Sequence, residues 1–348
     1  MRRSRGGSVP TSPIIGYYVH HQGSGHTHRA LAISRASSVP IAGLSTAPRP
    51  ARWRGEWVNL PDDAGATDVD NESAYGRLHY APERHRGLRE RMAAISAWIA
   101  ETRPAALVVD VSVEVALLAR LHGVPVVTVA MPGERDDAAH RLGYDIAEAI
   151  LAPWPRAAGA LWPATGADLD KTFFLGAVSR FAPVRLPGPP SNRVVVLNGT
   201  GGTGASPTQV RAAANATPEW EWVHLDRTHG RWVDDPWPVL CSAAVVVSHA
   251  GQNSVAEIAA ARRPAIVIPQ ERPFAEQAVM GRALAGLRGV PALVRSDWPT
   301  PDQWPDLLTR ASRLDGSGWT VWNDGRGAQR AAEALQNLVD APLSRESA

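Results

Sequence analysis

The chain has 348 residues, of which 44% are hydrophobic and 20% are charged, and its formal net charge at pH 7 is +2. This composition excludes a wholly disordered chain, and the length predicts two domains rather than one. The single cysteine, Cys241, excludes an internal disulfide and a cysteine-based zinc or iron–sulfur site. It also fits a reducing compartment.

The distribution of basic and apolar residues argues against nucleic-acid and membrane-spanning proteins. Basic residues cluster only at Met1–Arg5, so no nucleic-acid partner is expected. No apolar run reaches the roughly 18 residues that span a bilayer, and Ile14–Val19 is too short for the apolar core of a signal peptide. We therefore expect a cytoplasmic protein. The sequence leaves open the oligomeric state and a peripheral contact with a membrane.

The first half of the chain alternates apolar strands with amphipathic helices. Strands are predicted at 14–19, 39–45, 105–110 and 124–130, and helices at 25–37, 84–102 and 113–122. This alternation is typical of a parallel sheet that is covered by helices on both faces.

A second alternating series begins at Arg193, with strands at 194–197, 243–247 and 265–268 and helices at 207–216, 253–261 and 326–339. We predict an α/β chain of two Rossmann-like, doubly wound domains that face each other across a cleft. The predicted domains are 1–181 and 193–325, a proline-rich linker at 182–192 joins them, and a C-terminal helix and tail follow at 326–348. Ligands of such sheets bind at the carboxyl ends of the strands.

The segment from Val245 to Glu257 predicts an anion site. A strand ends, a small-residue turn follows and a helix begins, and helix N-termini offer unpaired amides and partial positive charge. Gly251 allows close approach to the backbone, and Asn253 and Ser254 are good helix caps. Glu257 lies about one turn further on, where a carboxylate accepts ribose hydroxyls. Such caps are also common in purely structural turns, and His249 alone fits a structural role as well.

Here the chain resembles the donor-binding region of GT-B glycosyltransferases, both the glycosyltransferase family 28 C-terminal domain and the family 1 signature. The residues that carry the resemblance are His249, Gly251, Asn253, Ser254, Glu257, Pro264, Pro269, Glu276 and Gln277. The resemblance implies that His249 and the amides near Asn253 and Ser254 hold a diphosphate. It further implies that Glu257 holds the ribose, and that Glu276 and Gln277 hold the sugar. Arg262 replaces the family's helix-ending glycine, and no residue is assigned to the nucleobase.

A glycine-rich turn follows the strand 194–197 and precedes a helix. Its backbone amides are suited to phosphate, and a similar loop faces the donor phosphate in the family-28-like enzymes. Secondary candidates for the donor site are therefore Thr200, Gly201, Gly202 and Thr203. A flexible turn without a ligand is the alternative interpretation.

The turn after the first strand, His20–Arg29, lacks the third glycine and the acidic partner of a dinucleotide site, which excludes NAD. Gly25 and His26 are similar to the first loop of the same glycosyltransferases, and Gly25 is a candidate for the nucleotide-sugar site. The resemblance implies that His26 is the general base on the acceptor hydroxyl, and that Asp110, at the end of a strand, orients it. The alternative for Asp110 is a cap on the helix that starts near Val113.

No metal site is predicted. His26 and His28 lie on a turn or helix start rather than on a strand. The sequence downstream also lacks the Asp–His motif of a metal hydrolase. Asp168 and Asp170 resemble the manganese motif of another nucleotide-sugar fold, but they precede a strand, and we expect a solvated loop there.

Together with these patterns, the resemblance implies an inverting, metal-independent glycosyltransferase without a cofactor. The donor is expected to be a nucleoside-diphosphate sugar, UDP-linked, and the acceptor a small-molecule or lipid-linked hydroxyl compound. Three alternatives remain open: a nucleotide-sugar hydrolase, in which water replaces the acceptor, a nucleotide-sugar epimerase, and a non-catalytic nucleotide-sugar-binding protein.

Overall fold

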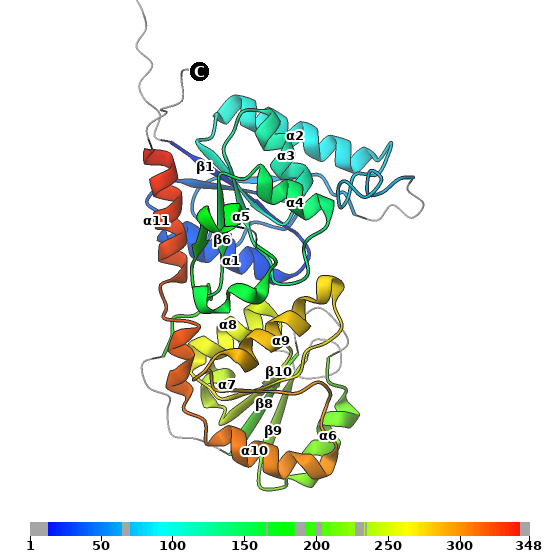
Figure 1. Cartoon of the computed structure of the whole chain (residues 1–348), viewed down its shortest axis with the longest axis vertical. Coiled ribbons are helices and arrows are strands. Elements are labelled where there is room, and N and C mark those ends of the chain that lie inside the picture. Colours follow the sequence, from blue (N-terminus) through cyan, green and yellow to red (C-terminus); the bar gives the residue numbers. More distant parts are fainter. Residues whose placement is uncertain are drawn as a thin grey trace, which may run out of the picture.

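The computed structural model describes residues 13–64, 70–164, 166–184, 192–198, 204–226, 233 and 235–341. They form two parallel sheets, each accompanied by helices, which follow one another along the long axis of the molecule (Figure 1). The predicted α/β class with two Rossmann-like halves is confirmed.

The sheet of the first half has seven strands in the order β3-β2-β1-β4-β5-β6-β7, all parallel. The chain leaves β1 toward one edge and returns at β4 beside it, so the direction of winding switches between these two strands. The strands are β1 (Ile15–Val19), β2 (Ile41–Ser45), β3 (Trp57–Asn59), β4 (Ala106–Asp110), β5 (Val126–Val129), β6 (Ala149–Ala152) and β7 (Thr172–Phe174). The helices are α1 (Ser24–Ala36), α2 (Arg86–Thr102), α3 (Val113–Leu121), α4 (Ala138–Asp145) and α5 (Gly166–Asp170).

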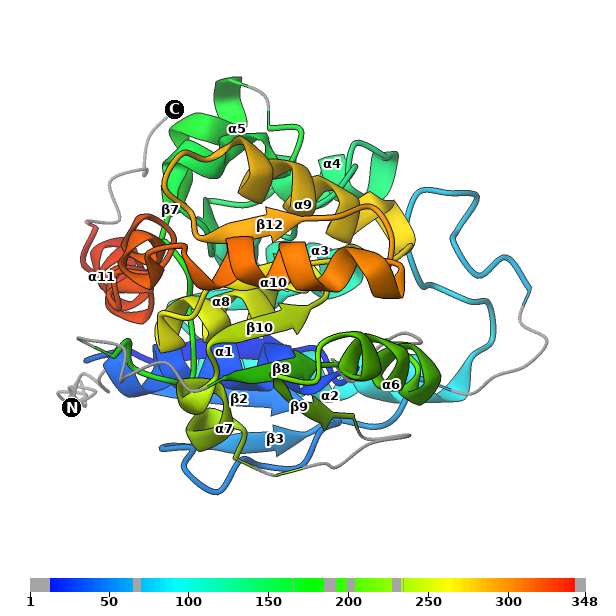
Figure 2. The same ribbon diagram turned by 90° about the horizontal axis from the view of Figure 1, so that it is seen from below.

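The sheet of the second half has five parallel strands in the order β12-β11-β10-β8-β9, and Figure 2 shows it from below. Its winding switches between β8 and β10. The strands are β8 (Arg193–Leu197), β9 (Glu221–Leu225), β10 (Val245–Ser248), β11 (Ala265–Val267) and β12 (Ala292–Val294). The helices are α6 (Pro207–Ala216), α7 (Trp237–Ser242), α8 (Gln252–Ala261), α9 (Glu276–Gly286) and α10 (Trp304–Ser312).

The strands beside the two switch points are inner strands of the two sheets. Every residue of β1, β4 and β10 is buried, which explains why these segments read as continuous apolar runs rather than alternating ones. Loops at the carboxyl ends of such strands meet at one edge of the sheet, where α/β folds bind ligands. We therefore expect ligand-binding residues in the segments after β1, β4, β8 and β10.

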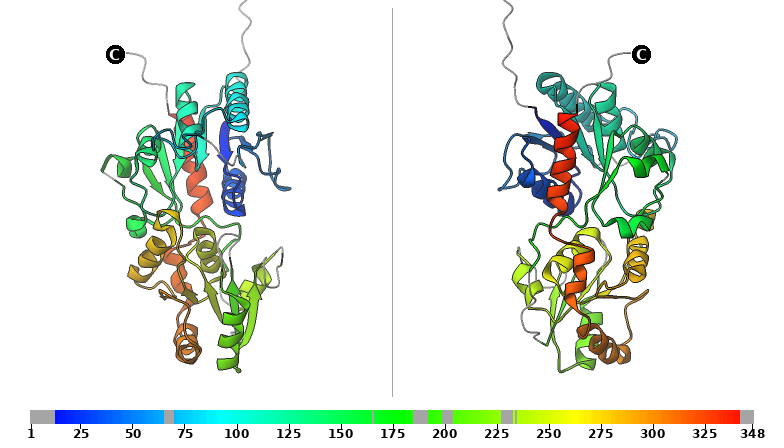
Figure 3. Two further views of the ribbon diagram at one scale, coloured as in Figure 1. Left: turned by 90° about the vertical axis from the view of Figure 1, so that its right-hand side faces the viewer. Right: turned by 60° about the vertical axis from the view of Figure 1, so that its left-hand side comes forward.

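The two halves share one apolar cluster, which joins Trp154 and Leu161 of the first half to Val255 and Met280 of the second. The C-terminal helix α11 (Gly327–Asp340) then returns to the first half and packs on α1, as Figure 3 shows from two sides. Its Ala331 belongs to the core of the first sheet. The chain thus passes between the halves twice.

Several smaller predictions can be compared with these elements. Asp168 and Asp170 lie in α5 and Asp168 is buried, so the expected solvated loop is wrong. Within the predicted linker 182–192, residues 185–191 lie outside the described residues, and the domain boundaries stay predictions. None of the helices in the described ranges combines the length and the apolar composition that crossing a bilayer requires.

Candidate active site

A cleft of about 560 Å³ lies between the two halves, within the size range of small-molecule sites. Both halves contribute to it, through the loops at the two switch points. The predicted site residues that line it are Gly25, His26, His249, Gly251, Asn253, Ser254, Glu257, Glu276 and Gln277. The candidates Thr200, Gly201, Gly202 and Thr203 lie outside the described residues.

His26 and Asp110 form a pair at the switch point of the first sheet. His26 lies in the first turn of α1, and Asp110 is the last residue of β4. Nδ1 of His26 lies 2.9 Å from Oδ1 of Asp110, whose side chain is fully buried. An ionised carboxylate only accepts hydrogen bonds, so the ring donates to Asp110 in the tautomer that carries its proton on Nδ1, and Nε2 is then the acceptor. Nη2 of Arg29 lies 3.0 Å from the same Nδ1, and because both groups are donors in this tautomer, that contact is not a hydrogen bond. The alternative role for Asp110 is wrong, because Ser112 caps α3.

Arg29 completes this pair, and the sequence reasoning gave it no role in the site. It follows His26 by three residues on α1, so both side chains lie on one face of the helix. Its Nε donates to Oδ2 of Asp110 at 3.0 Å, and its Nη2 donates to Oδ1 at 2.7 Å. Burial alone would raise the pKa of Asp110, but the guanidinium of Arg29 and the ring of His26 hold that pKa well below its usual range.

The backbone directly after Asp110 is strained. Val111 has a φ of 65°, a left-handed conformation that a β-branched residue rarely adopts. Such a residue costs on the order of 1–3 kcal/mol and persists only where the surrounding structure imposes it. Val111 also lines the cleft, so the strain lies at the carboxyl end of β4, next to the buried pair.

In the second half, the turn after β10 leads directly into α8. Gly251 is the N-cap and the helix begins at Gln252, so Asn253 and Ser254 are helical residues and not the caps that the sequence suggested. The helix start has no side-chain cap. Its first amides therefore keep their donors available at the edge of the cleft, in the arrangement that favours an anion.

His249 presents one ring nitrogen without a partner. Its Nδ1 lies 3.0 Å from the carbonyl oxygen of Ile268, and since a carbonyl only accepts, Nδ1 carries a proton and donates. Its Nε2 is buried and has no hydrogen-bond partner among the described residues. Burial lowers the pKa of His249, so the ring is neutral near pH 7.

Glu257 faces the cleft, as the prediction for the ribose requires, but it is already paired. Nε of Arg180 lies 2.7 Å from its Oε1, and Arg180 comes from the segment after β7 in the first half. Burial raises the pKa of Glu257, and the charge of Arg180 opposes that rise. Sequence reasoning missed Arg180 because it lies outside every recognised motif.

Glu276 and Gln277 lie at the start of α9. The loop that precedes them in the chain contacts the first half, where the backbone N–H of Glu134 donates to the carbonyl oxygen of Phe274. Oε1 of Gln277 accepts a hydrogen bond from the backbone N–H of Gln270 at 2.9 Å. Oε2 of Glu276 lies 3.8 Å from Nη2 of Arg135 in the other half. Phe274, just before them, has a φ of 58° and lies 4.7 Å under the guanidinium of Arg135.

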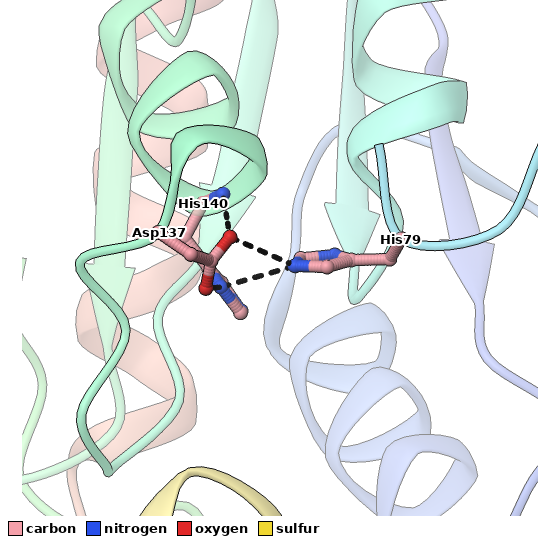
Figure 4. A group of neighbouring side chains, drawn as sticks. All are labelled: His79, Asp137 and His140. Carbon is pink, nitrogen blue, oxygen red and sulfur yellow. Dashed lines mark hydrogen bonds and ion pairs between the residues drawn. The ribbon is translucent and has the colours of Figure 1, made fainter. Parts of the chain in front are cut away.

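Two groups of side chains in the described residues bring metal-ligating atoms close together, and neither contains His26 or His28. One comprises His21, Asp62 and Asp63, and the other His79, Asp137 and His140. Figure 4 shows the second group, whose side chains point toward one another.

The hydrogen bonds of the second group give it a structural role. Asp137 caps α4 by accepting from the backbone N–H of His140 at 3.0 Å. Nε2 of His140 lies 2.9 Å from Nη1 of Arg135, and because a guanidinium only donates, the proton of this ring resides on Nδ1. Burial lowers the pKa of His140 to about 4, so the ring is neutral at pH 7. Arg135 therefore holds the tautomer in which Nδ1 has no lone pair for a metal.

Comparisons with known proteins concern the fold and one segment of the second half. Residues 231–280 match the glycosyltransferase family 28 C-terminal domain. Among solved structures, the glycotransferase of kitacinnamycin has a TM-score of 0.64 at 19% identity, covering 95% of this chain and 100% of its own. The spinosyn forosaminyltransferase SpnP has a TM-score of 0.66 at 13% identity, covering 94% and 100%. MurG of Acinetobacter baumannii has a TM-score of 0.59 at 14% identity, covering 93% and 100%.

No curated protein matches the chain. The solved structures are too distant in sequence to indicate more than a shared fold, which is GT-B. The family match lies on the segment that carries β10, α8, β11 and the start of α9. The comparisons therefore confirm the predicted resemblance to glycosyltransferases of the GT-B fold.

Proposed function

We propose that the protein is an inverting, metal-independent glycosyltransferase that moves a sugar from a nucleoside-diphosphate sugar, UDP-linked, to an acceptor hydroxyl. One observation carries the proposal. A histidine paired with a buried carboxylate, His26 with Asp110, faces the same cleft as the uncapped start of α8 and His249, whose Nε2 has no partner among the described residues. A base and an anion site thus come from opposite halves.

In this reaction the donor lies on the second half. The first amides of α8 and Nε2 of His249 contact the diphosphate, and Glu257 accepts hydrogen bonds from the ribose hydroxyls. Glu276 and Gln277 hold the sugar. These fixed donors stabilise the negative charge that develops on the leaving diphosphate, which is the role that a metal ion has in other transferases. We propose no cofactor.

His26 acts on the acceptor. Its Nε2 takes the proton of the acceptor hydroxyl while that oxygen forms a bond to the anomeric carbon, and the bond from that carbon to the diphosphate breaks. Attack on the side opposite the leaving group inverts the configuration. Asp110 holds the ring in the required tautomer and stabilises the imidazolium that forms.

The acceptor enters from the first half. A small pocket of about 40 Å³ adjoins the cleft and shares Val111, Met131 and Arg135 with it. Its other lining residues include Val109, Val113 and Tyr144. This mostly apolar lining suits an apolar part of a small-molecule or lipid-linked acceptor whose hydroxyl stays beside His26.

A nucleotide-sugar hydrolase is the second candidate, because Gly25 and His26 followed by Arg29 also resemble the first turn of such enzymes. Sugar release from UDP- and TDP-sugars, with and without a panel of acceptor alcohols, separates the two. Turnover that requires an acceptor supports the transferase, and equal turnover without one supports the hydrolase. Isomerised donor indicates an epimerase, and binding without turnover indicates a non-catalytic sensor.

A further inference from the structure

We propose that the side-chain amide of Gln252 donates a hydrogen bond to the sugar-linked phosphate of the donor, and that Arg29 is the positioning residue that aims it. This inference rests on the proposed function and adds two residues to it. Sequence reasoning assigned neither residue a role in binding the donor. Together they connect the His26–Asp110 pair of the first half to the anion site of the second half.

Arg29 is held rigidly. Asp110 accepts from its Nε at 3.0 Å and from its Nη2 at 2.7 Å, and both side chains are buried. The remaining nitrogen, Nη1, crosses to the other half and donates to Oε1 of Gln252 at 2.8 Å. Since a guanidinium has no acceptor, the oxygen of this amide must face Arg29.

The amide nitrogen of Gln252 must therefore face away from Arg29. Gln252 is only 8% exposed and lines the cleft, and its Nε2 is buried with no hydrogen-bond partner among the described residues. An unpaired buried donor is costly, and the great majority of such groups have an acceptor. A polar donor that a neighbouring residue holds in this orientation is suited to an acceptor on a ligand.

The position of Gln252 indicates which oxygen accepts. It is the first residue of α8, so its side chain starts from the end of the helix where the free amides and Nε2 of His249 favour an anion. Through Arg29 it is linked to Asp110, which pairs with His26 at the reacting end of the cleft. Glu257, which we assign to the pentose, lies further along the helix. The phosphate nearest the reacting end is the one that carries the sugar.

The test compares UDP with UMP, which lacks that phosphate, by calorimetric titration of the wild type and of Gln252→Met. A hydrogen bond to a charged group corresponds to about a 10- to 150-fold change in affinity. We expect UDP to lose about that much in Gln252→Met and UMP to change by less than about twofold. Gln252→Glu keeps an oxygen toward Arg29 but presents a carboxylate to the phosphate, so its loss for UDP should be larger. TDP and TMP serve as a second pair of probes.

Gln329→Glu is the control for Gln252→Glu, because it adds the same negative charge at an exposed position on α11. This variant should bind both nucleotides as the wild type does. Equal losses for UDP and UMP in Gln252→Met, or no loss for either, would overturn this inference alone. A wild type that binds none of the four nucleotides would contradict the proposed function itself.

The role of Arg29 is tested by coupling. Arg29→Lys keeps a positive charge beside Asp110 but cannot make all the bonds of the guanidinium, so the Gln252 amide loses its fixed orientation. We expect this variant to reduce the ratio of UDP to UMP affinity, and the double variant Arg29→Lys/Gln252→Met to bind UDP no more weakly than Gln252→Met alone. A merely structural Arg29 would lower the melting temperature and leave the ratio unchanged. Additive losses of UDP affinity would refute the positioning role.

Discussion

Gly25 and Asn253 touch across the cleft: a Cβ atom on Gly25 would lie 1.9 Å from Nδ2 of Asn253. Gly25 directly precedes His26 in α1, and Asn253 is the second residue of α8. The contact between the first turn of α1 and the predicted diphosphate site therefore has no room for a methyl group on Gly25. Under the proposed function, this contact limits how near His26 can come to the donor.

The first prediction concerns this contact. In Gly25→Ala the new methyl group must displace the Asn253 side chain or separate the two helices. Alanine is favoured over glycine in a helix by up to about 1 kcal/mol, so the melting temperature should not fall by more than a few degrees. Activity should fall at least about tenfold, because a misplacement of about 1 Å can cost catalysis that much or more. Initial rates and thermal unfolding measure the two effects.

Gly286→Ala is the control, since a Cβ on this exposed glycine of α9 would meet nothing within 4 Å. A second comparison uses Asn253→Ala, which removes the obstructing side chain. In that background Gly25→Ala should cost little further activity. A fully active Gly25→Ala single variant would show that the contact does not set the geometry of the site.

The second prediction concerns the base. Removal of His26 in His26→Ala should lower kcat by about 10²- to 10⁴-fold, the usual contribution of general base catalysis. The affinity for UDP should stay within about twofold, because the donor is assigned to the other half. His122→Ala, on an exposed histidine that contacts Ser96, should leave kcat unchanged. Full turnover by His26→Ala would disprove the assignment of the base.

The third prediction concerns stability. Asp110→Asn leaves the buried guanidinium of Arg29 without its counter-charge, which costs about 3–5 kcal/mol in comparable pairs. Because Arg29 and His26 hold the pKa of Asp110 well below its usual range, the ionised carboxylate stabilises the fold above the unfolded pKa of about 4. That contribution is lost as the pH falls from about 4 through the lower folded pKa.

Urea unfolding of the wild type and of Asp110→Asn between pH 3 and pH 8 checks this expectation. The difference in the free energy of unfolding should be constant above about pH 5 and shrink at lower pH, where the Asp110 carboxyl of the unfolded chain takes up a proton while that of the folded chain is still ionised. A difference that does not change with pH would mean that the charge of Asp110 is not what stabilises the buried pair.

The sequence predicted the elements around the site well. Continuous apolar runs such as 245–248 belong to central strands that are buried on both faces, and the N-cap glycines Gly251 and Gly23 lie where the helices α8 and α1 begin. Strand order was not predictable, because it depends on which runs pair across the sheet. The helix cap illustrates the same limit, since Gly251 caps α8 although Asn253 is the better capping residue.

The residues that the sequence missed act between segments. Arg29, Arg180 and Gln252 each make their defining contact with a residue at least 77 positions away. A local pattern holds no information on such partners. Arg29 alone left a signal, because its spacing of three from His26 places both on one face of α1.

The fourth prediction concerns the pentose. If Glu257 accepts the ribose hydroxyls, the wild type should prefer UDP over 2′-deoxy-UDP, and Glu257→Ala should reduce that preference by about 10-fold or more. The preference should also weaken on acidification at a higher pH than for an ordinary glutamate, because burial raises the pKa of Glu257. Competition titrations with both nucleotides measure it. Glu221→Ala, on an exposed glutamate that pairs with Arg193, is the control.

The fifth prediction concerns the pH dependence of donor binding. Burial lowers the pKa of His249 in the free protein, and a diphosphate beside Nε2 favours the imidazolium and raises that pKa in the complex. Binding therefore takes up a proton, and the affinity should fall as the pH rises from the free pKa, below about 6.5, to the higher pKa of the complex. A nucleoside-diphosphate sugar is the suitable ligand, since it has no phosphate monoester that titrates near pH 6.

Titrations of UDP-glucose between pH 5.5 and pH 9, in buffers of different ionisation enthalpy, give both the affinity and the number of protons taken up. His249→Gln keeps a donor at the same place but does not titrate in this range, so its affinity should be nearly independent of pH. It should be weaker than the wild type at low pH and similar at high pH, where His249 has lost its charge. A wild type that binds without proton uptake at any pH would place the diphosphate away from His249, and the start of α8 would then have to hold it alone.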